Sequence, residues 1–202
     1  MLASLHVIAL HRFGSGNPSG IEVKSSKDTI PIYPYFIVKD CITFGIFFIL
    51  LFLFVFYIPN YLGHPDNYIE ADPMVTPAHI VPEWYFLPFY AMLRSIPNKL
   101  LGVVTMIGSI AVWFLLPVLD KCKVKSGSHR PIFRIFYLFF VVNFCFLAWL
   151  GGQEVREPFV TLSRLSTLYY FSYFFIVLPI LSKYEKPVVL PKTISDAVPE
   201  MK

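Results

Sequence analysis

The sequence is poor in charged residues and rich in long apolar runs. Only 15% of the 202 residues are Asp, Glu, Lys or Arg, whereas 56% are hydrophobic and 18% are aromatic. Soluble globular domains carry roughly 25% charged residues. The composition therefore excludes an ordinary soluble fold and indicates a protein of the lipid membrane.

Cysteine is also scarce, and its pattern excludes a cysteine-based site. The three cysteines, Cys41, Cys122 and Cys145, form no CxxC pair, so neither a disulfide framework nor a thiolate metal site is expected. The N-terminal stretch MLASLHVIALHRFGSGNP lacks a basic region and a small-residue cleavage site, and does not have the pattern of a secretory signal. It reads as the last turns of a helix that stops at the following glycines and proline.

The apolar runs predict the fold class. A helix needs about 20 residues to cross the roughly 30 Å hydrocarbon core, and these runs are too long for strands. We expect an all-α, polytopic membrane helix bundle with the end of one helix and four transmembrane helices. The expected membrane region 1–182 comprises a helix end over 1–12 and helices over about 39–59, 100–119, 132–150 and 165–182, and a polar C-terminal tail follows over 183–202.

Basic residues are distributed unevenly between the loops. With alternating crossings, the segment up to Lys39, the loop 120–134 and the tail share one side and hold thirteen of the 17 Lys and Arg residues. The positive-inside rule places this side toward the cytoplasm or matrix. Membrane topology thus explains the net charge of +4. No stacking platform accompanies the basic residues, so no nucleic-acid partner is expected.

Two histidines near the N-terminus are candidates for separate roles. His6 and His11 are five residues apart, so on a helix their side chains point about 140° apart and cannot share one metal ion. His6, beside the small residues Ala3 and Ser4, is compatible with an axial haem ligand. A histidine near a membrane boundary is more often an interfacial polar residue, and the residues alone leave both interpretations open.

A polar pair, Lys39 and Asp40, lies where the first full helix enters the membrane, on the same side as His11 and Ser15. One interpretation is a helix entry, in which Lys39 reaches to the interface and Asp40 complements the helix dipole. The other is a polar pocket in which these groups relay protons to a membrane-soluble substrate.

One carboxylate stands out in the stretch VPEWYFLPFYAMLRSIPNK. Glu83 lies between Pro82 and Trp84, on the side opposite the basic loops, and several aromatic residues follow it. Apolar surroundings disfavour a charged acid, which would suit Glu83 to accept a proton from a substrate and release it to water. The competing interpretation is an interfacial aromatic belt that includes an acid. The residues alone favour neither.

Several segments, in their order along the chain, resemble one family. The stretch GHPDNYIEADPMVTPAHIVPEWYFLPFYAMLRSIPNKLLG, with its PEWY and RSIPNK motifs, is joined by LHVIALHRFGSGNP, YPYFIVKD and WLGGQ. Together they resemble cytochrome b, the quinone-handling subunit of quinol:cytochrome c oxidoreductase (respiratory complex III). The resemblance covers nearly the whole chain apart from the end of the tail, and it implies the C-terminal half of cytochrome b.

The resemblance implies roles for individual residues. It makes His6 an axial ligand of the high-potential haem b on the basic side. Two quinone sites on opposite sides of the membrane are implied as well. The residues implied are His11, Ser15, Lys39 and Asp40 for quinone reduction, and Glu83 and Tyr90 as catalytic residues, with Pro82 and Tyr85 as quinone-binding residues, for quinol oxidation.

The resemblance also implies chemistry and partners. The expected function is electron transfer from quinol to cytochrome c in a proton-translocating Q cycle, with ubiquinone as substrate, in the mitochondrial inner membrane or a bacterial plasma membrane. Expected partners are the N-terminal half of cytochrome b, the Rieske iron–sulfur protein, cytochrome c1 and other complex III subunits, in a dimeric complex. The second haem ligand would lie upstream of Met1, so this chain is not expected to be active alone.

Two other classes compete with this interpretation. A transporter or channel would need intramembrane charges or broken helices in paired halves, and only Pro117 and Pro179 interrupt the helices, near their ends. A haem-free structural or quinone-site membrane subunit of a split cytochrome b-type complex would lack the haem ligand at His6. A reduced visible spectrum of the complex separates that alternative.

Overall fold

The computed structural model describes residues 1–14, 21, 23, 29–77, 79–124 and 126–189, and within these residues all regular structure is helical. Four helical stretches are long and apolar enough to cross a membrane. The expected all-α polytopic membrane bundle is therefore confirmed. The four spans are Ile32–Tyr57, Lys99–Leu119, Pro131–Gly151 and Phe159–Tyr184.

The elements follow one another as α-helices joined by short turns of tighter or wider helix. In chain order the α-helices are α1 (Leu2–Phe13), α2 (Ile37–Phe52), α3 (Leu87–Ser95), α4 (Lys99–Ala111), α5 (Leu116–Leu119), α6 (Pro131–Gly151), α7 (Phe159–Ser172) and α8 (Leu178–Tyr184). The π-helical turns are Ile32–Phe36, Leu53–Tyr57 and Tyr173–Val177, and the 3-10 turns are Pro65–Tyr68, Trp84–Phe86, Val112–Leu115 and Gly127–His129.

The last span begins at Phe159, several residues before the expected start at 165. Its first turns are polar, which is why hydropathy alone assigned them to a loop. In the structure Ser163 is buried, and the Nε of Arg164 donates a hydrogen bond to the carbonyl oxygen of Ser95 at 2.9 Å. These polar groups face α3 rather than lipid, so the helix continues through them.

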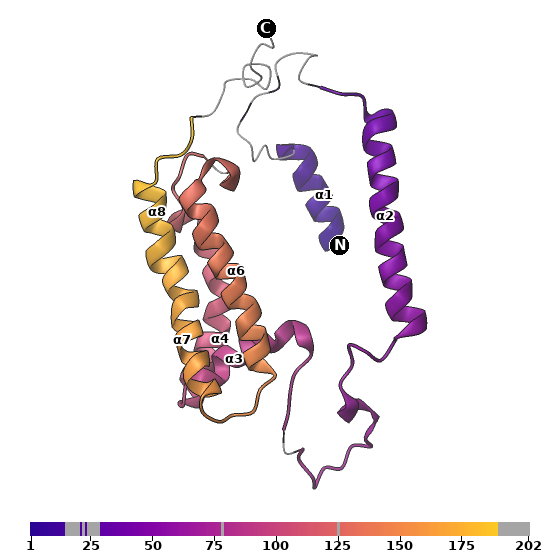
Figure 1. Ribbon diagram of the computed structural model, residues 1–202, viewed down its shortest axis with the longest axis vertical. Helices are drawn as coiled ribbons and strands as arrows, with labels where there is room; N and C mark the ends of the chain where they lie inside the picture. The colour runs from indigo at the N-terminus through magenta and orange to yellow at the C-terminus, as the bar shows by residue number, and fades with distance from the viewer. Residues whose placement is uncertain (15–20, 22, 24–28, 78, 125, 190–202) are drawn as a thin grey trace.

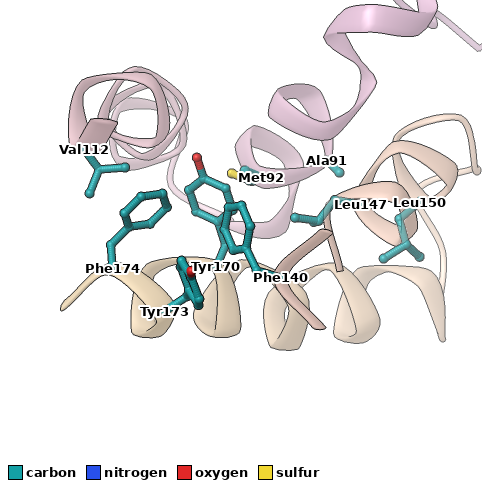
Figure 2. Packing of buried hydrophobic residues seen from close by; sticks show 9 residues of the cluster. All are labelled: Ala91, Met92, Val112, Phe140, Leu147, Leu150, Tyr170, Tyr173 and Phe174. Atoms are coloured by element: carbon teal, nitrogen blue, oxygen red, sulfur yellow. The ribbon is translucent and has the colours of Figure 1, made fainter. Parts of the chain in front are cut away.

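The core lies between α3, α6, α7 and the turn Tyr173–Val177, with Val112 at its edge. Figure 2 shows aromatic side chains from different helices converging there. The rings of Phe140 and Tyr173 stack with centroids 4.4 Å apart. The Tyr170 hydroxyl donates to the carbonyl of Ser109 at 2.7 Å, and Trp113 Nε1 donates to that hydroxyl at 3.0 Å. The buried Tyr170 hydroxyl is thus paired both as a donor and as an acceptor, as buried polar groups generally are.

The first two helices stand apart from this bundle (Figure 1). None of the residues from Met1 to Arg12 is buried, and α2 has no buried residue. The span that contains α2 is strongly apolar, yet none of its most apolar stretch is buried. Such a helix is hydrophobic on all sides and fits surroundings of lipid or other membrane helices.

The short helix α3 crosses the end of α6 at very close range. A Cβ atom at Gly151 would collide with the backbone carbonyl of Leu87, and one at Gly102 would lie 2.6 Å from the carbonyl oxygen of Leu93. Real Cβ atoms do not approach this closely, so both positions require glycine at the present spacing. The WLGGQ motif therefore has a packing role against the start of α3.

A buried ionic network closes the opposite end of the bundle. Arg130, whose side chain is 0% exposed, lies 2.8 Å from an oxygen of Asp120 and 3.3 Å from one of Glu185. The other oxygen of Glu185 accepts hydrogen bonds from the backbone amides of Ile132 and Phe133, at 2.8 and 3.0 Å. These are unpaired amides at the start of α6, so Glu185 caps that helix.

The expected boundary between the helices and the tail differs from the structure. The last helix ends at Tyr184, and Glu185 is buried in the network. The amide of Val188 then donates to the carbonyl of His129 at 2.9 Å. Glu185 and the backbone of Val188 thus tie this part of the expected tail to the start of α6, although most side chains of 183–189 are exposed. Residues 190–202 lie outside the described residues.

Candidate functional site

The predicted site residues come from segments at two ends of the molecule. In Figure 1 the C-terminal end of α1, the N-terminal ends of α2 and α6 and the C-terminal end of α8 all point to one end, and α3 lies at the other. This arrangement agrees with the alternation of sides that the loop charges predict. The residues are described below, one end at a time.

His6 and His11 lie on the single regular helix α1, so the angular separation expected from their spacing applies. Both side chains are exposed. One helical turn before and after His6 lie Ala3 and Ala9, whose small side chains leave space beside the imidazole. The space beside His6 would therefore accommodate a bulky planar group such as a haem, with His6 as its ligand from this helix. The facing wall is not formed by the described residues.

Lys39 and Asp40 lie side by side in the first turn of α2, and both are exposed. The span itself begins at Ile32, although Tyr33 has extended backbone angles (φ −100°, ψ 135°). The pair therefore lies in the first turns of this candidate span. The carbonyl of Lys39 accepts a hydrogen bond from the Thr43 hydroxyl at 2.9 Å. Ser15, predicted to share this site, lies outside the described residues.

Glu83 immediately precedes the turn Trp84–Phe86 and is exposed, without a side-chain hydrogen bond to that turn. Its aromatic neighbours Trp84 and Tyr85 are 58% and 63% exposed, and Pro82 is half-buried. The expectation that apolar side chains enclose Glu83 is wrong for the described part of this chain. Any such enclosure has to be completed by other polypeptide or by lipid.

Tyr90 and Arg94 hold the segment after Glu83 in place. The Tyr90 hydroxyl donates to the carbonyl of Ile80 at 3.1 Å, and the Arg94 guanidinium lies 4.6 Å from the Tyr90 ring centroid. The guanidinium also donates to the carbonyls of Leu150, Gly151 and Gln153, at 2.9 to 3.1 Å. These are carbonyls at the C-terminal end of α6, where a cation is favourable.

Burial affects the charge of this arginine only slightly. Desolvation lowers the pKa of Arg94, while Tyr90 partly offsets the effect. An arginine remains protonated even so, because its ordinary pKa is far above neutrality. Arg94 therefore acts as a permanent positive charge that joins α3 to the end of α6.

Comparison with known proteins identifies this arrangement. A family model described as cytochrome b (C-terminal)/b6/petD matches residues 70–171, which include α3 to α6 and most of α7. The chain belongs to the cytochrome b C-terminal family. It is similar to cytochrome b of Rickettsia prowazekii (59% identical over 194 residues, 96% of this chain and 49% of the relative) and of Rhodospirillum rubrum (50% identical over 194 residues, 96% and 48%).

A solved structure titled "Hyperthermophilic respiratory Complex III" extends the comparison to three dimensions. It matches with a TM-score of 0.82 and 33% identity, over 90% of this chain and 46% of that chain. Coverage of this extent reaches well beyond the residues 70–171 that the family model matches. The chain therefore spans about half the length of its cytochrome b relatives, and it is a multi-pass membrane protein.

Two anchoring groups of this cytochrome b family member escaped sequence analysis. Arg94 lies in the RSIPNK motif, which predicts no contact for it, yet it binds carbonyls at the C-terminal end of α6. Arg130 falls in the expected loop 120–134 and Glu185 in the expected tail, yet they form the buried network. The partners are 55 to 59 residues apart in the sequence. The only local signal was an arginine and a glutamate close to the ends of apolar runs.

Proposed function

We propose that this chain is part of a quinol:cytochrome c oxidoreductase, where it contributes to the quinol-oxidation and quinone-reduction sites and supplies one haem b ligand. The observation that carries the proposal is the family match over residues 70–171, because this stretch contains Glu83, Tyr90 and the anchoring residue Arg94. The similarity to a chain of a respiratory complex III supports it. The membrane would be a bacterial plasma membrane or the mitochondrial inner membrane.

At the end bearing α3, Glu83 accepts a proton from bound quinol. Its exposure leaves the carboxylate free to turn between a substrate and water. Pro82 and Tyr85 flank it and line the pocket that other parts of the complex complete. The Tyr90 hydroxyl donates its hydrogen bond to the carbonyl of Ile80. In this conformation Tyr90 positions the segment that carries Glu83.

At the other end, His11, Lys39 and Asp40 bind quinone and deliver protons to it, together with Ser15. Lys39 and Asp40 are neighbours in one exposed turn. Lys39 provides a hydrogen-bond donor, and Asp40 provides a carboxylate that can pass protons on. When bound, haem b would supply a reversible one-electron carrier, and His6 is the residue of this chain that would hold it. Expected partners are the N-terminal half of cytochrome b, the Rieske iron–sulfur protein and cytochrome c1.

Replacement of Glu83 by glutamine tests this proposal in the intact complex. The change removes the proton acceptor and preserves shape, so quinol oxidation should slow by about 100-fold or more, as for loss of a general base. Haem absorbance should stay at the wild-type level. The matched control is Glu70→Gln, an exposed acid of the same loop. Unchanged quinol oxidation from pH 6 to about 8 would favour the interfacial aromatic belt instead.

A second candidate is a haem-free structural or quinone-site subunit of a split cytochrome b-type complex. The observation in its favour is that the family match begins at residue 70 and so does not include His6. A reduced-minus-oxidised spectrum of the purified complex, with wild-type chain and with His6→Ala, decides between the two. Spectra that are identical for both would support the haem-free candidate.

A further inference from the structure

A hollow lies between the ends of α5 and α8, on the side of the membrane that carries most of the basic residues. Its volume is about 310 Å³, within the range of roughly 300–1,000 Å³ typical of ligand sites. It combines apolar residues from the ends of two membrane spans with polar and cationic residues. The α5–α8 hollow is lined by Val118, Leu119, Pro179, Lys121, Ser182 and Lys183.

The two helix ends that form the hollow are tied together. The backbone amide of Lys121 donates to the Ser182 hydroxyl at 2.6 Å. The ammonium of Lys183 lies 5.1 Å from the ring centroid of its neighbour Tyr184, and tyrosine is enriched at the membrane–water interface. The backbone of Lys121 is thus fixed beside α8, and both lysines lie on one hollow at the ends of two membrane spans.

The two lysines of the hollow are not paired directly with the nearby acids. Asp120 and Glu185 are the closest acids along the chain, and both are paired with the buried Arg130, at 2.8 and 3.3 Å. Neither Lys121 nor Lys183 forms an ion pair with another residue of the described part of the chain. Among the described residues, the hollow thus presents two lysine ammonium groups that no carboxylate contacts directly.

We propose that the α5–α8 hollow binds an anionic phospholipid. Its phosphate lies between Lys121 and Lys183, and an acyl chain runs along Val118, Leu119 and Pro179. Basic pockets between membrane helices on the cytoplasmic or matrix side suit anionic headgroups. A soluble anion would leave the apolar residues unused, whereas a phospholipid uses both parts of the hollow. This site is independent of the proposed electron transfer.

The test uses the purified complex in vesicles that contain a photoreactive phosphatidylglycerol with its reactive group in the acyl chain. In the wild type, we expect labelled peptides from α5 and α8, and much weaker labelling by the matching phosphatidylcholine. Each lysine near an anionic lipid surface contributes about a factor of five in affinity, so Lys121→Gln with Lys183→Gln should weaken binding about 30-fold. The control Lys99→Gln, an exposed lysine on the opposite side of the membrane, should leave labelling unchanged, and Lys123→Gln, outside the hollow, should weaken it no more than about fivefold.

A second variant separates lipid binding from simple charge attraction. Val118→Trp keeps both lysines but fills the apolar part, and it should also reduce labelling. Inorganic phosphate should not displace the lipid. The proposal is overturned by full labelling of the Lys121→Gln, Lys183→Gln variant, by equal labelling with phosphatidylcholine, or by displacement with inorganic phosphate. Wild-type thermal unfolding of each variant verifies that the bundle is intact.

Discussion

Replacement of Glu185 by alanine should destabilise the helix bundle by about 3–5 kcal/mol, the cost of removing one partner of a buried ion pair. The Glu185 side chain is 1% exposed, and its two oxygens serve Arg130 and two backbone amides of α6. Without it, Arg130 keeps only Asp120, although one of its terminal nitrogens already lacks a partner among the described residues. The Nε of Arg130 and the two backbone amides would then lack their acceptor in a buried place at the start of α6.

Glu185→Gln divides this effect into its parts. The amide oxygen of glutamine still accepts from the α6 backbone, but one of the two negative charges beside Arg130 is gone, so we expect a loss of about 1.5–3 kcal/mol. Lys186→Ala, at the exposed neighbouring residue, should change stability by less than about 0.5 kcal/mol. A loss of stability that decreases from Glu185→Ala to Glu185→Gln to Lys186→Ala would indicate a carboxylate that both caps α6 and pairs with Arg130.

Thermal unfolding of the detergent-solubilised complex measures these differences. At roughly 2–4 °C per kcal/mol for a chain of this size, Glu185→Ala should lower the Tm by on the order of 10 °C. A Tm within about 2 °C of the wild type would refute the argument, because the network would then contribute no more than a surface ion pair.

The pH dependence of this network follows from Arg130. Burial acts to lower the pKa of Arg130, but Asp120, Cys122 and Glu185 outweigh it, so the pKa is raised. A raised folded pKa gives stabilisation that is complete below the unfolded pKa and lost only as the pH rises through the folded value. For arginine that loss occurs in strongly alkaline solution. The Tm difference between wild type and Arg130→Met should therefore be the same at about pH 7.5 and pH 9.

Three further predictions concern other parts of the chain. Gly151→Ala should cost about 1–3 kcal/mol by overpacking against α3, whereas Gly152→Ala, with only ordinary contact at 3.6 Å, should be nearly neutral in the same melting assay. Asn98→Ala removes the side-chain cap of α4 and should cost about 1 kcal/mol; a loss below about 0.3 kcal/mol would mean that water replaces the cap. Lys39→Gln or Asp40→Asn should slow haem reoxidation by quinone more than haem reduction from the opposite side, measured by rapid-mixing absorbance, and equal effects on both steps would mean that the pair only anchors α2.

The interface of α3 with α6 shows why part of the fold was beyond sequence analysis. Arg94 lies in the RSIPNK motif, which the sequence marks clearly, but its hydrogen-bond acceptors are backbone carbonyls of the WLGGQ segment. A backbone carbonyl carries no residue-specific signal, so no pattern in the sequence names it as a partner. The same holds for Glu185 and the amides of α6. The environment of Glu83 was overestimated for a related reason: aromatic neighbours in sequence need not pack over a side chain in an extended loop.

The sequence by itself determined the membrane class, the four spans and the family, because these depend on the length of apolar runs and on motifs whose residues are adjacent in the chain. It also determined that His6 and His11 point in different directions, because a helix has a fixed angle per residue. The tertiary structure alone decided how the bundle is joined at its two ends. Arg94 binds the carbonyls at the C-terminal end of α6, and Glu185 binds the amides at its N-terminal end. The tertiary structure also decided that α1 and α2 stay outside that bundle with their apolar surfaces uncovered. These features depend on which distant segments meet in space, and the free energy that selects the meeting comes from burial and pairing of groups far apart in the chain.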